Sequence, residues 1–233
     1  MEDVFGVGGK KNPLFLAMQE YLREYLLADH SACVKVCQSP DPSLGLGSTV
    51  WDAGLVLCAF LESDPGKDLI RHTSCLELGS GTGIVAIAAS LLGTNTRAVA
   101  SDVSACTSFI KQNIGLNPDS ACTCIALDWD DREAARNLHA QFDWILCADC
   151  VYDPDNVEAL TQTILALAPR RGLIVSNEVR EAPGNAMAEK QFIQSMLKQG
   201  FVGRGVHKDV LRAEWRCDDI HVVVFEKGRV KGA

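Results

Sequence analysis

The sequence predicts an α/β fold: a doubly wound, seven-stranded, mostly parallel sheet of the Rossmann-like type, with an antiparallel last strand and an N-terminal extension. Between residues 74 and 199, short apolar runs alternate with amphipathic segments, which indicates βαβ units and a sheet covered on both faces. A turn rich in glycine, Gly79–Gly83, follows the first of these runs. The last run, Ile220–Glu226, has no helix after it and therefore predicts an antiparallel strand that closes the sheet.

Each element of the alternation has its own signal. Strands are recognised as short apolar runs bounded by turn residues, and helices by apolar residues spaced three and four apart. The pattern predicts strands at Ser74–Leu78, Ala98–Ser101, Cys122–Leu127, Trp144–Ala148 and Leu173–Ser176. It predicts helices at Gly83–Leu92, Ala105–Leu116, Asp155–Ala168 and Ala186–Gln199. We expect Phe201–Val206 to pair with the last strand as an antiparallel hairpin.

The N-terminal part of the chain does not share this alternation. Pro13–Ala28 has apolar residues at helical spacing, and proline suits a first turn, so a helix is predicted there. Cys33–Cys37 alternates as a short strand does. A loop rich in proline, glycine and serine then leads to a predicted helix at Asp52–Glu62. We divide the chain into an N-terminal extension, residues 1–46, and a main domain, residues 47–233.

Composition and charge argue against several classes of protein. Hydrophobic residues make up 47% of the 233 residues, which is enough for a substantial core. The formal net charge of −8 argues against a nucleic-acid partner, which needs a basic face, and it suits a basic protein target. The sequence has neither a signal-peptide pattern nor an apolar run of about 18 residues, so we expect no membrane contact. We expect a monomer in the cytoplasm, with the nucleus as the alternative.

The ten cysteines do not indicate a disulfide framework. Most lie inside apolar runs, where reduced cysteine behaves as a small hydrophobic residue. Cys147 and Cys150 have the spacing of a redox or metal motif, but the histidines are scattered singly and supply no further ligands. We therefore predict buried thiols in a reducing compartment and no metal site.

The strongest local signal is the run Glu-Leu-Gly-Ser-Gly-Thr-Gly from Glu77 to Gly83, which joins a predicted strand to a predicted helix. Glycines there allow a sharp turn and a close approach of the backbone to a ligand. Asp102 ends the next strand, where an acidic residue meets ribose hydroxyl groups. Dinucleotide-binding turns have the spacing G-x-G-x-x-G, whereas this one is G-x-G-x-G with a carboxylate two residues earlier. The spacing favours an S-adenosylmethionine-dependent methyltransferase over a dehydrogenase.

A set of ordered motifs extends this hypothesis. The motifs are GSTVWDAGLVL, CLELGSGTG, VASD, LDW and ADCVYDP, followed by DDIHV before the last strand. In this order and spacing the sequence resembles the seven-strand protein-lysine methyltransferases of the methyltransferase-like 21 group, from about Gly47 to Lys227. The resemblance implies S-adenosylmethionine as cofactor and S-adenosylhomocysteine as product. It also implies a protein substrate methylated on lysine, such as an ATPase chaperone like valosin-containing protein.

The resemblance further implies the residues of the site. Asp149 and Tyr152 match the family's D-x-x-Y motif and would act as the catalytic pair that aligns the lysine. Asp128 departs from the residue that the family often has before its tryptophan. The implied cofactor contacts are Trp51, Glu77, Gly79, Ser80, Gly81, Asp102, Trp129 and Ala148.

These residues also have plainer interpretations. Trp51 and Trp129 would serve as core side chains, Asp102 and Asp149 as helix caps, and Tyr152 as an apolar contact at a helix entry. The joint arrangement favours a ligand site, because each residue falls at the carboxyl edge of a parallel strand, where open α/β sheets bind ligands.

Other functions remain open at this point. Enzymes that methylate the amino groups of bases have an Asp/Asn-Pro-Pro-Tyr motif, and the prolines are missing between Asp149 and Tyr152. The remaining alternatives are a methyltransferase for another protein or small-molecule acceptor, and a non-catalytic cofactor-binding interaction module. Glu178 and Arg180 reach the same sheet edge, and they suit a substrate contact and solvated loop charges equally well.

Overall fold

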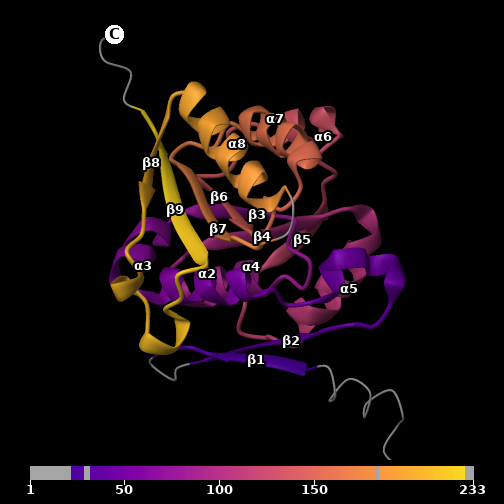
Figure 1. Cartoon of the computed structure of the whole chain (residues 1–233). Helices are drawn as coiled ribbons and strands as arrows, with labels where there is room; N and C mark the ends of the chain where they lie inside the picture. Colours follow the sequence, from indigo (N-terminus) through magenta and orange to yellow (C-terminus); the bar gives the residue numbers. More distant parts are fainter. Residues whose placement is uncertain (1–21, 29–31, 182–183, 229–233) are drawn as a thin grey trace, which may run out of the picture.

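The computed structural model describes residues 22–28, 32–181 and 184–228. A seven-stranded sheet in the order β5-β4-β3-β6-β7-β9-β8 carries helices on both faces (Figure 1). Neighbouring strands from β5 to β7 are parallel, whereas β9 is antiparallel to β7 and β8 is antiparallel to β9. The predicted fold class is therefore confirmed, together with its antiparallel end. The strands are β3 Ser74–Leu78, β4 Arg97–Asp102, β5 Thr123–Ala126, β6 Trp144–Ala148, β7 Gly172–Glu178, β8 Phe201–Gly205 and β9 Ile220–Lys227.

The order of the strands places a switch point in the middle of the sheet. From β3 the chain adds β4 and β5 on one side, and it then returns to add β6 and β7 on the other. The loops that follow β3 and β6 consequently diverge and leave a crevice between them. Ligands of open α/β sheets bind in such a crevice, at the carboxyl ends of the strands.

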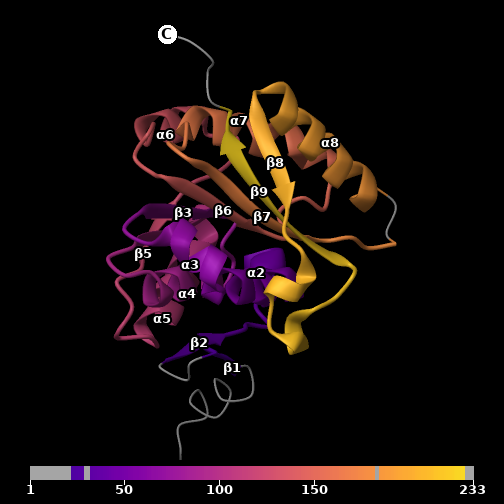
Figure 2. The same cartoon turned by 90° about the vertical axis from the view of Figure 1, so that its left-hand side faces the viewer.

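Helices form one layer on each face of the sheet (Figure 2). Alternate residues of β6 show why this strand reads as continuously apolar: Trp144 and Leu146 face one core cluster, whereas Ile145 and Cys147 face the other. One layer holds α2 Asp52–Glu62, α3 Asp64–Ile70, α4 Ile84–Leu92 and α5 Ser104–Gly115. The other holds α6 Arg132–Asn137, α7 Val157–Leu167 and α8 Asn185–Lys198.

Two short helices, α3 and α6, were not predicted from the sequence. Each begins at a side-chain cap, because the Ser63 hydroxyl accepts from the Gly66 N–H and the Asp131 carboxylate accepts from the Ala134 N–H. Both helices are too short to show a helical repeat of apolar residues. Short 3₁₀ helices make up other connections, namely η1 Pro42–Ser48, η2 Pro154–Asn156, η3 Lys208–Val210 and η4 Ala213–Trp215.

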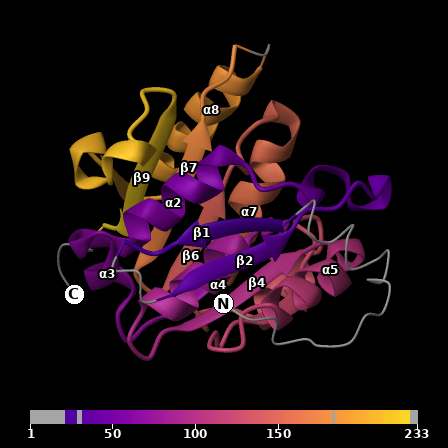
Figure 3. The same cartoon turned by 90° about the horizontal axis from the view of Figure 1, so that it is seen from below.

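The N-terminal segment corrects the sequence prediction. Residues 22–26 form strand β1, Leu22–Leu26, instead of the end of a helix, and β1 pairs antiparallel with β2, Cys33–Cys37. Residues 13–21 of the predicted helix lie outside the described residues. The hairpin lies beneath α2 and α4 (Figure 3), and the buried side chain of Tyr25 packs against Trp215 at a ring distance of 5.5 Å. Tertiary packing has thus overridden a helical spacing of apolar residues.

Two asparagines, Asn113 of α5 and Asn117 in the turn after it, bind β2 to the helix layer that contains α5. Asn113 Oδ1 accepts from the Cys37 N–H at 2.8 Å, and Asn117 Oδ1 accepts from the Lys35 N–H at 2.8 Å. Each amide nitrogen donates back, to Cys37 O and to Lys35 O. The hairpin also shares the core cluster of α2 and α4. The domain boundary at residue 46 stays a prediction.

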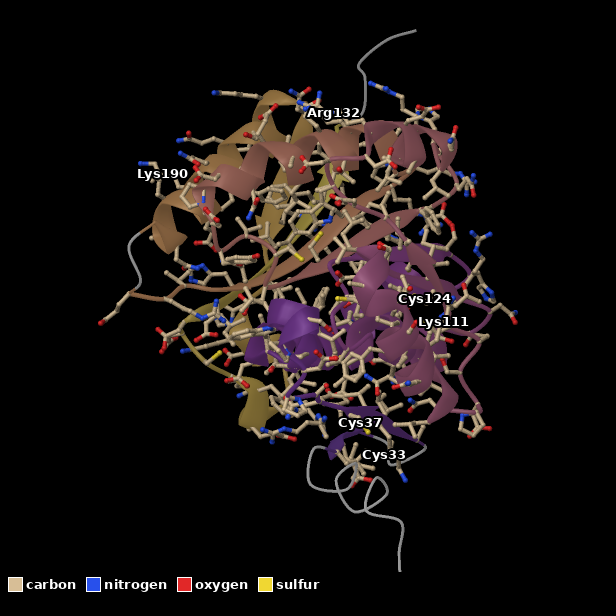
Figure 4. All side chains as sticks on the ribbon, turned by 90° about the vertical axis from the view of Figure 1, so that its right-hand side faces the viewer. Cys33, Cys37, Lys111, Cys124, Arg132 and Lys190 are labelled. Carbon is tan, nitrogen blue, oxygen red and sulfur yellow. The ribbon has the colours of Figure 1, made fainter. Side chains whose placement is uncertain are left out.

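All ten cysteines lie in the described residues, and none forms a disulfide. Figure 4 shows Cys33 and Cys37 on β2, well away from Cys124 on β5. No three His, Cys, Asp or Glu side chains within the described ranges are grouped to hold a metal ion. In the same ranges no single helix has the length and apolarity to cross a membrane, although the bent pair of η1 and α2 reaches both together.

Candidate functional site

A cavity of about 590 Å³ opens at the carboxyl edge of the parallel strands, at the switch point between β3 and β6. Its walls come from the loops after β3, β4, β5 and β6, from Arg180 just after β7, from η1 and from the start of α2. All of the predicted site residues line it, namely Trp51, Glu77, Gly79, Ser80, Gly81, Asp102, Trp129, Ala148, Asp149 and Tyr152. The structure therefore brings the ten residues together, while their individual roles remain predictions.

The glycine-rich loop after β3 requires glycine for two reasons. Gly79 and Gly81 have φ angles of 59° and 52°, in the left-handed region that side chains disfavour. A Cβ atom on Gly81 would also lie 3.0 Å from the carbonyl oxygen of Gly47, and one on Gly79 would lie 3.1 Å from the Trp129 ring. The loop thus lies close to Gly47 and to the ring of Trp129, and its backbone is open to a ligand.

Ser80 anchors this loop to the end of β4. Its backbone N–H donates to Ser101 O at 3.0 Å, and its hydroxyl accepts from the Ser101 N–H at 2.9 Å. The side chain is buried, which agrees with a contact to the ligand through backbone only.

Asp102 joins the loop to the neighbouring strand. Its carboxylate accepts from the Gly81 N–H at 2.8 Å with one oxygen and from the Val103 N–H at 2.8 Å with the other. The interpretation of Asp102 as a helix cap is wrong, because Val103 is the N-cap of α5 and no side chain caps that helix. Each carboxylate oxygen keeps a lone pair that can accept a hydrogen bond from the hydroxyl group of a ligand in the cavity.

Glu77 has a structural partner that the sequence did not reveal. Its carboxylate is buried and accepts from the backbone N–H of Ala86, in the first turn of α4, at 2.9 Å. Burial raises the pKa of Glu77 to about 8, although the hydrogen bonds from Ala86 and Ser80 oppose the shift. Glu77 thus supports the junction between the loop and α4, and its contact with a ligand stays a prediction.

Glu77→Gln should flatten the pH dependence of stability. The folded-state pKa of about 8 lies above the ordinary value of 4.5, so folding takes up a proton between these values. The stabilisation is full below the ordinary pKa and is lost as pH rises through the folded pKa. Glutamine keeps an oxygen for Ala86 and does not titrate. Urea unfolding should show that the free energy of unfolding of the parent falls between about pH 5 and pH 8. This fall should exceed that of the Glu77→Gln variant by an amount on the order of a few kcal/mol.

The matched control for this experiment is Glu133→Gln, at an exposed position of α6. It should unfold with the same pH dependence as the parent. Parallel curves for Glu77→Gln and the parent would contradict the buried, protonated state of this carboxyl group.

The two tryptophans of the predicted site both line the cavity. Trp51 is 38% exposed and its Nε1 donates to Leu46 O at 3.0 Å, which ties η1 to the start of α2. Trp129 is half-buried and packs against Gly79. Neither is a buried core side chain, unlike Trp144, which is 1% exposed. The core interpretation is therefore wrong for Trp51, whereas Trp129 both packs against a core cluster and lines the cavity.

Asp149 follows β6 in a strained conformation. Its φ angle is 57°, which is uncommon for a residue with a side chain and marks a site whose surroundings enforce it. Its N–H donates to Ser176 O at 2.8 Å, and the residue is only 8% exposed. The carboxylate caps no helix, since η2 and α7 begin at Pro154 and Val157.

Tyr152 stands three residues later at the mouth of the cavity. It is 37% exposed, and burial of the rest of the ring raises the pKa of its hydroxyl above the ordinary value. Between the two residues, Cys150 Sγ donates to Leu78 O at 3.2 Å and so fixes the turn against the end of β3. The D-x-x-Y segment thus presents one buried carboxylate and one accessible ring.

The sequence left the role of Arg180 undecided, and the structure places it inside the site. Its Nη1 donates to Asp149 Oδ1 at 3.2 Å, and its Nη2 contacts the other oxygen of Asp149 and Glu178 Oε2, the latter at 2.6 Å. The guanidinium lies 5.1 Å from the centre of the Trp51 ring. Burial opposes the charge, but the hydrogen bonds and charges of Asp149 and Glu178 raise the pKa of Arg180 above its ordinary value.

A profile of the lysine methyltransferase family matches residues 34–199 of the chain. The chain belongs to this family. The prediction of an S-adenosylmethionine-dependent methyltransferase is thereby confirmed, as is the predicted relation to the methyltransferase-like 21 group.

Named relatives of the methyltransferase include the Danio rerio protein N-lysine methyltransferase METTL21A, which is 32% identical over 90% of this chain and 89% of its own length. The Xenopus tropicalis EEF1A lysine methyltransferase 3 is 32% identical over 76% of this chain and 75% of its own. Among solved structures, the putative methyltransferase SMU.776, complexed with SAH, has a TM-score of 0.59 at 16% identity and covers 94% of this chain and 58% of its own. The fibrillarin of Aeropyrum pernix has a TM-score of 0.51 at 16% identity and covers 88% of this chain and 94% of its own, which supports the fold alone.

Proposed function

We propose that this methyltransferase transfers the methyl group of S-adenosylmethionine to a lysine side chain of another protein. The observation that carries the proposal is that the buried Asp149 carboxylate and the partly exposed ring of Tyr152 line the same cavity. A lysine side chain offers the two matching parts, a nitrogen for the carboxylate and an alkyl chain for the ring.

The residues of the cavity fit the cofactor. The glycine-rich loop leaves backbone open where a Cβ atom would meet Trp129 or Gly47, and Asp102 faces the same space with free lone pairs for ribose hydroxyl groups. When bound, S-adenosylmethionine supplies an activated methyl group, so the protein chiefly contributes alignment. Trp51 and Trp129 would enclose the methionine and adenine ends.

The acceptor side must present a neutral amine in line with the methyl group. A free lysine has a pKa of about 10.4, so its ammonium must lose a proton before the nitrogen attacks. Asp149 holds the nitrogen by accepting its hydrogen bonds, and Tyr152 flanks the alkyl chain with its ring. Because Asp149 is buried, the nitrogen is drawn toward the cavity and away from water.

The test is methyl transfer to lysate proteins from S-adenosylmethionine with a labelled methyl group, followed by mass spectrometry of the labelled band. We expect methyl-lysine in one or a few proteins and none with heat-treated enzyme. Purified valosin-containing protein is the first candidate acceptor, with other ATPase chaperones and the EEF1A named for one relative as alternatives. Label in purified RNA or DNA at a rate rivalling any protein would overturn the proposal.

We further expect the enzyme to act as a monomer in the cytoplasm or the nucleus. The acidic composition, with a net charge of −8, supports a basic protein segment rather than nucleic acid as the partner. Size-exclusion chromatography and imaging of the tagged chain test these two points.

A further inference from the structure

The guanidinium of Arg180 lies in surroundings that suit any organic cation. The carboxylate of Asp149 holds it on one side, and the face of the Trp51 ring lies 5.1 Å away on another. A carboxylate and an aromatic face are also the two groups that bind an alkylammonium ion. The group that sits there in the free enzyme therefore has the same charge as the acceptor lysine.

The charges around Arg180 leave one negative charge without a partner. Asp149 and Glu178 are both carboxylates, and Arg180 is the one cation bonded to them among the described residues. It is also the one basic side chain among the described residues that line the cavity. A cluster of two anions and one cation has a net negative charge, so it attracts a second cation and repels an anion. A ligand ammonium therefore fits better here than the carboxylate of the cofactor.

The backbone of this segment is held in place while the side chain remains accessible. The Arg180 N–H donates to Asn185 Oδ1 at 2.8 Å, and the Val179 N–H donates to Asp219 O at 2.7 Å. The Arg180 side chain is 27% exposed and that of Asp149 is 3% exposed. The long arginine side chain can therefore leave Asp149 by rotation alone, and Glu178, at 30% exposure, can keep the guanidinium.

We propose that Arg180 is a gating residue whose guanidinium fills the acceptor's cation site in the free enzyme and moves from Asp149 onto Glu178 when the substrate lysine enters. The proposal rests on the proposed function, because it names the site for the acceptor nitrogen. When the lysine has entered and before it loses its proton, the two carboxylates face two cations and the cluster is neutral. Segments without a cation cannot displace the guanidinium, so the gate selects a cationic side chain over a neutral or acidic one.

The competing interpretation is that Arg180 permanently anchors Asp149. An anchor and a gate differ in what the loss of Arg180 does to Asp149. If Arg180 is a gate, its removal opens the cation site, and small cations should bind there. If Arg180 is an anchor, its removal should leave Asp149 misplaced, and added guanidinium should restore the site.

The first experiment measures binding without methyl transfer. Parent and Arg180→Ala are melted in saturating S-adenosylhomocysteine, with n-butylammonium chloride or sodium chloride at equal ionic strength. S-adenosylhomocysteine keeps its own ammonium group, so the probe reports a separate cation site. The gate predicts that about 100 mM n-butylammonium raises the Tm of Arg180→Ala by about 3 °C and that of the parent by less than about 1 °C.

Matched variants make this result specific. Arg204→Ala removes an exposed arginine of β8 that pairs with Glu226, and it should respond as the parent does. Adding Asp149→Asn to Arg180→Ala should reduce the shift to less than half, because the buried anion of the site is gone and only the more exposed Glu178 remains. If Arg180→Ala does not fold, Arg180→Gln takes its place, since its amide still donates to Asp149 without compensating its charge. Equal shifts for the parent and the Arg180 variant, or a shift that Asp149→Asn leaves undiminished, would overturn the gate.

In a kinetic experiment, the gate and the anchor predict opposite effects of added guanidinium on Arg180→Ala. With an acceptor protein in hand, about 10 mM guanidinium chloride should inhibit Arg180→Ala competitively against that acceptor, and the KM of the variant without guanidinium should be lower than that of the parent. Rescue of kcat by guanidinium, with a raised KM in its absence, would establish the anchor and overturn the gate. Failure of the parent to methylate any lysine would instead count against the proposed function and leave the melting result to decide the cation site.

Discussion

Asp149→Asn should lower kcat by roughly 10²-fold or more, and kcat/KM by more than kcat because the acceptor's cation site is lost as well, while the affinity for S-adenosylhomocysteine stays close to that of the parent. The asparagine side chain has the same size but carries no charge, so it cannot compensate a developing cation on the acceptor nitrogen. Asparagine also tolerates the φ angle of 57° at this position, whereas alanine would add strain. Radiometric initial rates and calorimetric titration on the same preparation measure both quantities.

Three companion variants define what this result means. Tyr152→Phe removes only the hydroxyl and should cost less than Tyr152→Ala, which also removes the ring that flanks the alkyl chain. Asp155→Asn, at an exposed position in η2, is the control and should keep the parent rate. If Asp149→Asn binds the cofactor normally and methylates near the parent rate, Asp149 has no part in aligning the acceptor.

The parallel strands were predictable because their burial is uniform. Both strands face helices on both sides and are bounded by turns, so β6 is continuously apolar, and in β3 only Ser74 and Glu77 interrupt the apolar run. The predicted ranges Ser74–Leu78 and Trp144–Ala148 agree with the structure in full. Helix α2 was found in the same way, from an apolar run that begins after Trp51.

The N-terminal hairpin was not predictable, because what stabilises it lies elsewhere in the chain. The apolar spacing of residues 13–28 is that of a helix, yet Tyr25 is buried against Trp215, close to the other end of the chain. Strand β2 is held by the side-chain amides of Asn113 and Asn117. Nothing in the sequence around these two asparagines indicates that they bind a strand. Contacts between residues so far apart in the chain leave no pattern in the local sequence.

The cavity was predictable from motifs, whereas its electrostatics were not. The resemblance gave ten residues that all line one cavity, and nine of them lie at or just after the ends of parallel strands. The expectation of a strand end is wrong for Trp51, which is the N-cap of α2 and follows η1. It did not give the hydrogen bond from Ala86 to Glu77 or the placement of Arg180 on Asp149 and Trp51. Both depend on side-chain directions in loops, and a charged residue after a strand is also common on a solvated surface.

Asp102→Ala should weaken S-adenosylhomocysteine binding by about 1.5–3 kcal/mol, which is roughly 10- to 150-fold in Kd. Two losses add up in this variant. The Gly81 N–H loses its acceptor at 2.8 Å, so the glycine-rich loop is held less firmly, and the ribose hydroxyl groups lose a charged acceptor. Isothermal titration against the parent measures the sum, with Asp119→Ala, at an exposed loop position, as the control.

A cycle with a second ligand separates these two losses. S-adenosylhomocysteine lacking a ribose hydroxyl group should bind the parent more weakly than the complete ligand does, because Asp102 then has one donor fewer. In Asp102→Ala the two ligands should bind almost equally, since the partner of that hydroxyl group is already gone. If the missing hydroxyl costs the same in the variant as in the parent, Asp102 acts on the cofactor only through Gly81, and the ribose contact implied by the family resemblance is wrong for this chain.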